Sequence, residues 1–268
     1  MTNASPFSRV DFSLIDRRIF YPRRDPFSPV PAGAEDHSFP VEPGIEIGGR
    51  FYPADSAGPL LLFFHGNGEI ASDYDEIGPA YNRLGISLLV ADYRGYGRSQ
   101  GNPSVSTLLS DALTVFDQVE DWRQNQGRTG PLLIMGRSLG SAPAIEIAWR
   151  RKERIAALIL DSAFAYTLPL LKVLGIPVDT WGLHEEDGFR NHEKISSISK
   201  PTLLIAGRRD DLIPYTESET LLQLSSAQRK ELVLVPGAGH NDIFARCGAG
   251  YFELVSRFIK PLLRKQKR

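Results

Sequence analysis

The chain alternates short, wholly apolar runs with segments of helical length, and this alternation restricts its possible folds more than any other feature. The apolar runs occupy residues 59–64, 86–91, 131–135, 155–160, 203–206 and 231–235. The helical segments occupy residues 70–84, 104–124, 139–152, 215–224 and 241–263. Strands that are apolar on both faces belong in a sheet covered on both faces, which is a mostly parallel one. The pattern therefore predicts an α/β fold, with a mostly parallel central sheet and helices on both faces.

Two regions fall outside this alternation. Residues 1–40 are rich in proline and arginine and are predicted to form an extended N-terminal lead-in, followed by a pair of short strands within residues 41–52. Residues 162–199 are too long for a simple connection between a strand and a helix. We expect this segment to form a small lid over the carboxyl edge of the sheet. The predicted organisation is thus one α/β domain over residues 41–268 with a lid insertion at about 162–199.

The composition argues against several classes of partner. The 268 residues include 31 basic and 32 acidic side chains, for a net charge of −1, so no nucleic-acid partner is expected. No apolar run approaches the length of about 18 residues that spans a bilayer. Residues 1–15 also lack the basic segment followed by an apolar stretch that is typical of a signal peptide. We therefore expect no integral membrane segment and a cytoplasmic localisation, while the oligomeric state stays open.

The sequence offers no pattern for a cofactor or a metal. No spacing of His, Cys and Asp matches a zinc or iron site, and no phosphate-binding loop is present. The single cysteine, Cys247, rules out an intramolecular disulfide and is predicted to be a small residue packed in or near the last helix. The expected chemistry is therefore one that side chains and backbone groups perform alone.

A glycine-flanked serine follows the third apolar run. Residues 136–140 read GRSLG and stand between a predicted strand and a predicted helix. A serine in this setting sits on a sharp turn that projects its hydroxyl from the sheet edge, as in α/β-hydrolase folds. Side chains in place of Gly136 or Gly140 would collide with the neighbouring strand or helix. Ser138 is therefore the predicted nucleophile of an α/β-hydrolase fold.

A serine nucleophile needs a base, and the base needs an acid that orients it. In this fold the two partners follow the serine in the order acid and then histidine, each after a later strand. His240 follows the final apolar run and precedes a helix, so it is the predicted base. Two adjacent carboxylates follow the run before it, and Asp210 is preferred as the acid, with Asp211 as the fallback.

The negatively charged oxygen of a tetrahedral intermediate needs two backbone donors. One is predicted to be the N–H of Leu139, directly after the nucleophile. The other should come from the loop after the first apolar run, where the N–H of Asn67 is our candidate. His65, in the same loop, is interpreted as a structural histidine because the triad already has a base.

Together these motifs resemble the BEM46-like branch of the α/β-hydrolase superfamily. The matching segments are HGNG at 65–68, DYRGYGRS at 92–99, GRSLGS at 136–141, LDS at 160–162, GRRD at 207–210 and GAGHN at 237–241. The resemblance runs from about residue 40 to the end of the chain. It implies an acyl-enzyme mechanism on a carboxyl ester, thioester or peptide-type substrate, and it supports Asp210 as the acid.

Members of this branch are described as serine aminopeptidase-like, or as thioesterases that act on S-acylated proteins. The present sequence differs from the membrane-bound members because it shows no hydrophobic anchor and no cysteine-rich segment near its N-terminus. This difference argues against membrane association and protein depalmitoylation. A small-molecule acyl substrate, cleaved without a cofactor, is the leading expectation.

Aromatic and aliphatic residues of the lid leave two interpretations open. Phe164, Leu168 and Trp181 either line an apolar substrate pocket or pack as core. The function also has alternatives. An aminopeptidase-like enzyme would need a carboxylate, such as Glu69 or a lid acid, to hold the substrate amine. A hydrolase-fold protein that binds a ligand without turnover is the non-enzymatic alternative.

Overall fold

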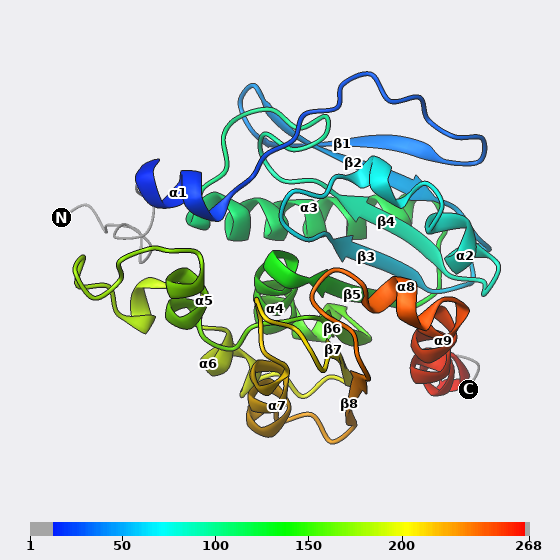
Figure 1. The fold of residues 1–268 in the computed structure, drawn as a ribbon. Coiled ribbons are helices and arrows are strands. Elements are labelled where there is room, and N and C mark those ends of the chain that lie inside the picture. Colours follow the sequence, from blue (N-terminus) through cyan, green and yellow to red (C-terminus); the bar gives the residue numbers. More distant parts are fainter. Residues whose placement is uncertain (1–12, 266–268) are drawn as a thin grey trace.

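The structure, a computed structural model, describes residues 13–265 and contains an eight-stranded sheet in the order β1-β2-β4-β3-β5-β6-β7-β8 (Figure 1). The strands are β1 (Glu35–Glu42), β2 (Ile45–Tyr52), β3 (Leu60–Phe64), β4 (Ser87–Ala91), β5 (Leu132–Arg137), β6 (Ala157–Asp161), β7 (Thr202–Gly207) and β8 (Lys230–Val235). Strands β4, β3, β5, β6, β7 and β8 pair in parallel, and β2 joins them in antiparallel fashion. Each predicted apolar run is one of the parallel strands.

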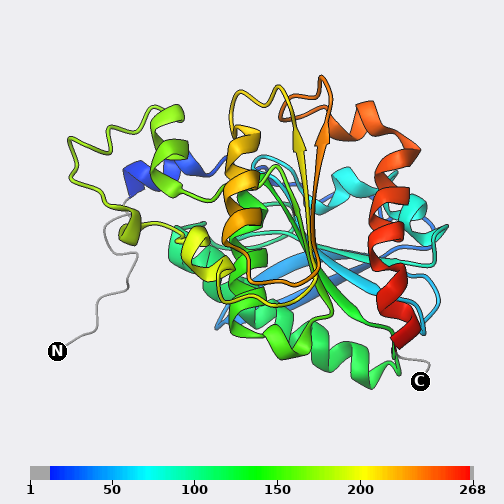
Figure 2. The ribbon, with the colours of Figure 1, turned by 90° about the horizontal axis from the view of Figure 1, so that it is seen from below.

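Helices cover both faces of the sheet, as expected. On one face lie α3 (Val105–Asn125), α4 (Ser141–Arg150) and α7 (Tyr215–Leu224), and on the other α2 (Gly78–Asn82) and α9 (Ala249–Lys265), as Figure 2 shows. The remaining helical elements are α1 (Ser13–Ile19), η1 (Ala71–Tyr74), η2 (Ser138–Gly140), η3 (Lys152–Arg154), α5 (Thr167–Val173), η4 (Glu185–Asp187), α6 (Asn191–Ile195) and α8 (Ile243–Cys247). Within residues 13–265 no helix is both long enough and apolar enough to cross a bilayer.

Two of the predicted helices are divided in the structure. Residues 70–84 form the short η1 and α2, and proline stands at the start of α2. Residues 241–263 form α8 and α9, which Gly248 separates with a φ of 51°. A left-handed residue cannot continue a helix, so the chain turns there and only α9 packs along the sheet. Periodicity across residues 241–263 did not reveal this break.

The N-terminal hairpin begins earlier than residue 41. Strand β1 starts at Glu35, so the boundary predicted after residue 40 falls inside a strand. Pro40 made a strand at this position look unfavourable from the sequence, and the strand register shifts between Pro40 and Glu42. An edge strand tolerates proline because its outer N–H groups need no ladder partner. Residues 1–12 of the predicted lead-in lie outside the described residues.

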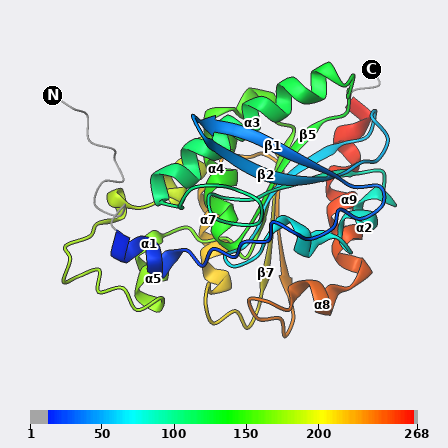
Figure 3. The same ribbon diagram turned by 90° about the horizontal axis from the view of Figure 1, so that it is seen from above.

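The insertion at residues 162–199 carries α5, η4 and α6, and it lies beside α1 (Figures 1 and 3). The Arg18 guanidinium donates a hydrogen bond of 2.9 Å to the carbonyl of Gly175 across this contact. Glu217, on α7, accepts the backbone N–H groups of Ala165 and Tyr166 at 2.8 and 2.9 Å. The insertion is thus held by the lead-in and by α7.

Candidate active site

Ser138 directly follows the last residue of β5 in a strained backbone conformation. Its φ is 51°, a value that non-glycine residues rarely adopt. A Cβ at Gly136 would lie 2.1 Å from the carbonyl oxygen of Gly140, and a Cβ at Gly140 would lie 2.1 Å from that of Phe64. Both glycines are therefore required by close backbone approach, for the reason that the sequence predicted. This turn aims the serine side chain at the carboxyl edge of the sheet.

Ser138, His240 and Asp210 form a continuous chain of hydrogen bonds. The Ser138 Oγ lies 2.9 Å from His240 Nε2, and His240 Nδ1 lies 2.7 Å from Asp210 Oδ2. A carboxylate only accepts, so the Nδ1 of the neutral ring carries the proton and Nε2 is left to accept the serine hydroxyl. This is the arrangement that a general base requires.

Asp210, and not its neighbour Asp211, is the acid beside the histidine. The Asp210 side chain is fully buried, and its Oδ1 accepts the backbone N–H groups of Leu212 and Ile213 at 3.0 and 2.8 Å. Asp211 is exposed. The two backbone donors fix the Asp210 carboxylate in place, so its second oxygen is free to orient the imidazole.

The loop after β3 lies against the turn at Ser138, as the approach of Gly140 to Phe64 requires. His65 is buried, with Nδ1 2.8 Å from the carbonyl of Gly66 and Nε2 3.2 Å from Asp92 Oδ1. These contacts are those of a structural histidine. The Asn67 side chain accepts the N–H of Tyr21 at 3.0 Å, so the lead-in helps to hold this loop.

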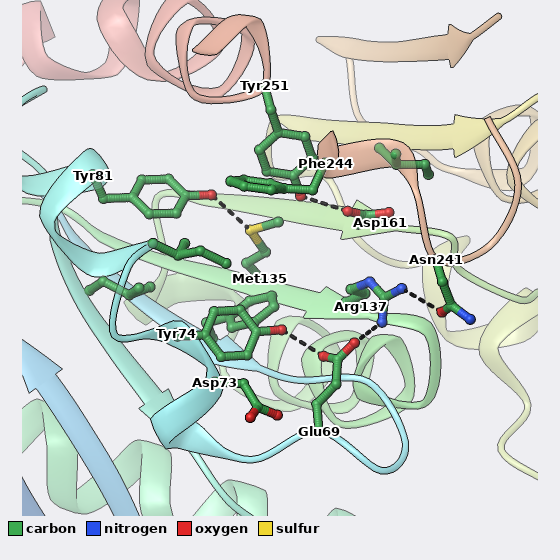
Figure 4. Close-up of a pocket in the computed structure, with 14 residues that line it drawn as sticks. Glu69, Asp73, Tyr74, Tyr81, Met135, Arg137, Asp161, Asn241, Phe244 and Tyr251 are labelled. Carbon is green, nitrogen blue, oxygen red and sulfur yellow. Dashed lines mark hydrogen bonds and ion pairs between the residues drawn. The ribbon is translucent and has the colours of Figure 1, made fainter. Parts of the chain in front are cut away.

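An ion pair that the motifs did not predict connects this loop with the histidine loop. Arg137 donates hydrogen bonds to the His240 carbonyl at 2.9 Å and to Asn241 Oδ1 at 3.1 Å, and it pairs with Glu69 (Figure 4). Glu69 in turn accepts the Gly66 N–H at 2.8 Å and the Tyr74 hydroxyl at 2.6 Å. The sequence held one signal for this contact: side chains alternate between the two faces of a strand, and along β5 this alternation turns Arg137 away from the face that α4 covers.

The Arg137–Glu69 pair is mostly buried, with side chains 16% and 26% exposed. Burial by itself would raise the pKa of Glu69, but the Arg137 charge and the Tyr74 hydroxyl outweigh it and hold the pKa below the usual value. Burial likewise opposes the charge of Arg137, yet Glu69 and Asp161 raise its pKa. Both groups are therefore ionised at neutral pH, and the pair is a fixed link between the two loops.

A cavity of about 240 Å³ lies next to this ion pair, between the sheet and the helices α2, α8 and α9 (Figure 4). Its walls are aromatic and aliphatic, and Arg137, Glu69 and Asp161 add charge. The residues that line it are Phe63, Glu69, Asp73, Tyr74, Ile77, Tyr81, Leu88, Met135, Arg137, Asp161, Asn241, Ile243, Phe244 and Tyr251. Arg137 and Asn241 are the sequence neighbours of Ser138 and His240, so the cavity adjoins the triad without including it.

The three predicted pocket residues of the insertion do not line this cavity. Phe164 is 1% exposed, and its ring packs against that of Phe189 with centroids 5.5 Å apart. Leu168 packs, partly buried, against the same core, and Trp181 is 37% exposed. For Phe164 these contacts are those of a core residue, one of the two alternatives that the sequence left open.

Other titratable groups are placed away from this chemistry. Cys247 is half-buried at the end of α8, where burial raises the pKa of its thiol. A raised pKa favours the unreactive thiol form. Among the described residues, no group of three or more His, Cys, Asp and Glu side chains is arranged to hold a metal ion.

Known proteins resemble this chain in sequence. A family model described as Serine aminopeptidase, S33, matches residues 55–179. The uncharacterized protein Rv2307c of Mycobacterium tuberculosis is 34% identical over 261 residues, which cover 91% of this chain and 86% of the relative. The uncharacterized protein YfhR of Escherichia coli K12 is 32% identical over 255 residues, which cover 92% of this chain and 88% of the relative.

Solved structures share the fold at lower identity. The esterase Pf2001 of Pyrococcus furiosus superimposes with a TM-score of 0.72 at 20% identity, over 90% of this chain and 98% of the esterase. A soluble variant of monoglyceride lipase from Saccharomyces cerevisiae superimposes with a TM-score of 0.64 at 18% identity, over 88% of this chain and 97% of the lipase. The sheet order, the turn at Ser138 and these similarities lead to one conclusion: the chain has the α/β-hydrolase fold and belongs to one family with Rv2307c and YfhR.

Proposed function

We propose that this protein is a BEM46-like serine hydrolase that cleaves a carboxyl ester or thioester through an acyl-enzyme intermediate on Ser138. The observation that carries the proposal is the hydrogen-bond chain from Ser138 through His240 to the buried Asp210. Such a chain turns a weakly nucleophilic hydroxyl into a reactive one. The similarity to a solved esterase and a solved lipase supports the same reaction class.

In the acylation step, Ser138 Oγ attacks the substrate carbonyl carbon while His240 Nε2 takes the hydroxyl proton. The new Oγ–C bond makes the carbonyl oxygen an oxyanion, for which the N–H groups of Leu139 and Asn67 are the proposed donors. Collapse of this intermediate breaks the bond to the alcohol or thiol, which leaves with the proton from His240. Asp210 orients the imidazole and stabilises its charged form.

Deacylation repeats these roles with water. His240 removes a proton from a water molecule, the resulting hydroxide attacks the acyl carbon, and the Ser138 Oγ–C bond breaks as the proton returns to Oγ. The carboxylic acid product then leaves. The whole cycle uses side chains and backbone donors of this chain alone.

Fluorophosphonate labelling with intact-mass readout tests the proposal. Wild-type protein should gain one adduct, and Ser138→Ala should gain none. A matched control is Ser110→Ala, which removes an exposed hydroxyl on α3 and should label like the wild type. Turnover of p-nitrophenyl esters and of S-acyl thioesters should disappear with the label. Folded wild-type protein that takes no label would contradict the proposal and favour a binding protein without turnover.

An aminopeptidase-like activity is the second candidate, because the matching family model is described as a serine aminopeptidase. Glu69 was the sequence candidate for holding a substrate amine, but its carboxylate is already bound by Arg137, Tyr74 and the Gly66 N–H. This occupancy favours the esterase. Cleavage of aminoacyl-naphthylamides at a higher kcat/KM than that of p-nitrophenyl esters would reverse the ranking.

A further inference from the structure

The cavity beside the Arg137–Glu69 pair has the features of a second binding site. It is bounded by β3, β4, β5 and β6 on one side and by η1, α2, α8 and α9 on the other, and Figure 4 shows side chains from both sides pointing into it. Asp73 and Asn241, at its rim, are exposed, so a ligand can enter from solvent there. Neither Ser138 nor His240 lines it. The cavity is therefore a site distinct from the triad.

Asp161 is a buried carboxyl group in the cavity wall that the proposed reaction does not use. Asp161 is 3% exposed, and its oxygens accept the hydroxyls of Tyr251 at 2.6 Å and of Ser162 at 3.0 Å. Among the described residues it forms no ion pair, whereas the other two acids of the cavity do: Glu69 pairs with Arg137 and Asp73 with Arg23. Asp161 is therefore the acid lining the cavity that has no salt bridge among the described residues, although Arg137 on the neighbouring strand acts on its charge.

A buried carboxylate without a salt bridge is costly, and the surroundings of Asp161 reflect this. Burial raises the pKa of Asp161, although Arg137 and the hydroxyls of Tyr251 and Ser162 oppose the rise. Ser162, the next residue, has a φ of 49°, so the chain also holds this corner in a strained conformation. A cation that entered the cavity would supply a direct salt-bridge partner.

Aromatic rings line the part of the cavity wall that includes Asp161. Tyr81, Phe244 and Tyr251 lie on its side of the cavity in Figure 4, and the rings of Phe244 and Tyr251 pack with centroids 5.3 Å apart. The faces of such rings attract cations and stack with other rings. Tyr74 lies on the opposite side in Figure 4, and its ring packs against that of Phe63 with centroids 4.9 Å apart. The walls therefore suit a flat apolar group that carries a positive charge.

The volume sets the size of the ligand. A dry engineered cavity of about 150 Å³ takes up benzene, so the volume here, about 240 Å³, holds one aromatic ring with a short side chain. From the volume, the aromatic walls and the buried acid without a salt bridge, we propose that this cavity binds a small aromatic primary amine whose ammonium group pairs with Asp161. The ring of the ligand then lies among Tyr81, Phe244 and Tyr251.

The test compares three ligands of the same shape and different charge: 3-phenylpropylamine, 3-phenylpropan-1-ol and 3-phenylpropanoate. Binding is measured by isothermal titration calorimetry in an amine-free buffer. All measurements use the Ser138→Ala protein, so the result is independent of whether Ser138 is catalytic. The variants are Asp161→Asn, which removes the charge and keeps the shape, and Asp179→Asn, the same change at a side chain that is 85% exposed on the insertion.

The amine should bind about 10- to 100-fold more tightly than the alcohol, and the propanoate more weakly than either. Asp161→Asn should abolish the preference for the amine while the alcohol still binds, and Asp179→Asn should preserve it. Ile77→Trp, which places a large side chain in the cavity wall, should weaken both neutral and cationic ligands.

Three results would overturn the proposal: equal binding of amine and alcohol by the unchanged cavity, an amine preference that survives Asp161→Asn, or binding of none of the three ligands. Should Asp161→Asn fail to fold, as judged by circular dichroism, the ranking of the three ligands and the Ile77→Trp result still decide the question.

Discussion

Replacing Arg137 by methionine should separate the two loops that frame Ser138. Methionine has a similar length but no donors, so the change removes the hydrogen bonds to the His240 carbonyl and to Asn241 and leaves Glu69 without its cation. Glu69 then holds the Gly66 N–H without being tied to the histidine loop. We expect Arg137 to act as a positioning residue, through the placement of His240 and not through contact with the substrate.

The magnitude follows from burial. Breaking a fully buried pair by removing one partner costs about 3–5 kcal/mol, and an exposed pair contributes at most about 1 kcal/mol. The Arg137 and Glu69 side chains are 16% and 26% exposed, nearer the buried limit. After a discount for solvent screening, we expect the free energy of unfolding to fall by about 2 kcal/mol. A displacement of His240 by about 1 Å would lower kcat by about 100-fold.

The assay combines ester turnover with urea unfolding. Arg137→Met should lower kcat with little change in KM, because the substrate site itself is untouched. Arg137→Lys should restore part of the lost kcat, since it returns the charge but not the forked geometry. The control is Arg257→Met on α9, where the Arg257 side chain is 70% exposed. This change should leave kcat and the free energy of unfolding nearly unchanged.

A double-mutant cycle of Arg137→Met and Glu69→Gln measures the coupling energy between these two residues. If the two residues act as one link, the double variant should lose little more kcat than the worse single variant, which means a coupling energy of about 1–2 kcal/mol. Additive effects, or an Arg137→Met enzyme with wild-type kcat, would refute the idea that this ion pair positions the histidine.

Three further predictions concern the same edge of the sheet. Gly140→Ala should destabilise the fold by about 1–3 kcal/mol and impair turnover, because its Cβ would lie 2.1 Å from the Phe64 carbonyl oxygen. The control is Gly250→Ala on α9, which has open space around it and should be neutral or stabilising in thermal unfolding. Asp210→Asn should lower kcat about 10⁴-fold through the wrong histidine tautomer; normal turnover by a folded variant would exclude Asp210 as the acid. The stability that ionised Glu69 contributes should be fully present above its ordinary pKa of 4.5 and be lost as the pH falls through the lower pKa of the folded state. The free energies of unfolding of wild type and Glu69→Gln, measured by urea titration, should therefore converge at acid pH. A difference between these free energies that stays constant with pH would contradict this.

Much of the fold follows from local pattern. The parallel strands coincide with the apolar runs because a strand covered on both faces must be apolar at every position. The turn at Ser138 is also local, since Gly136 and Gly140 are needed wherever backbone approaches this closely. The order of Ser138, Asp210 and His240 along the chain then placed all three at one edge, because parallel strands end on the same side of a sheet.

What only the tertiary structure decided are the contacts between segments far apart in the chain. Choosing Asp210 over Asp211 depends on which side chain is buried against His240, because both lie in the loop after the same strand. The Arg137–Glu69 link joins residues 68 positions apart, and neither belongs to a motif that demands it. The cavity at Asp161 arises where α8 and α9 pack over β5 and β6, so its shape depends on side chains that sequence periodicity cannot bring together. Periodicity reports which face of an element is buried, and packing determines what that face meets.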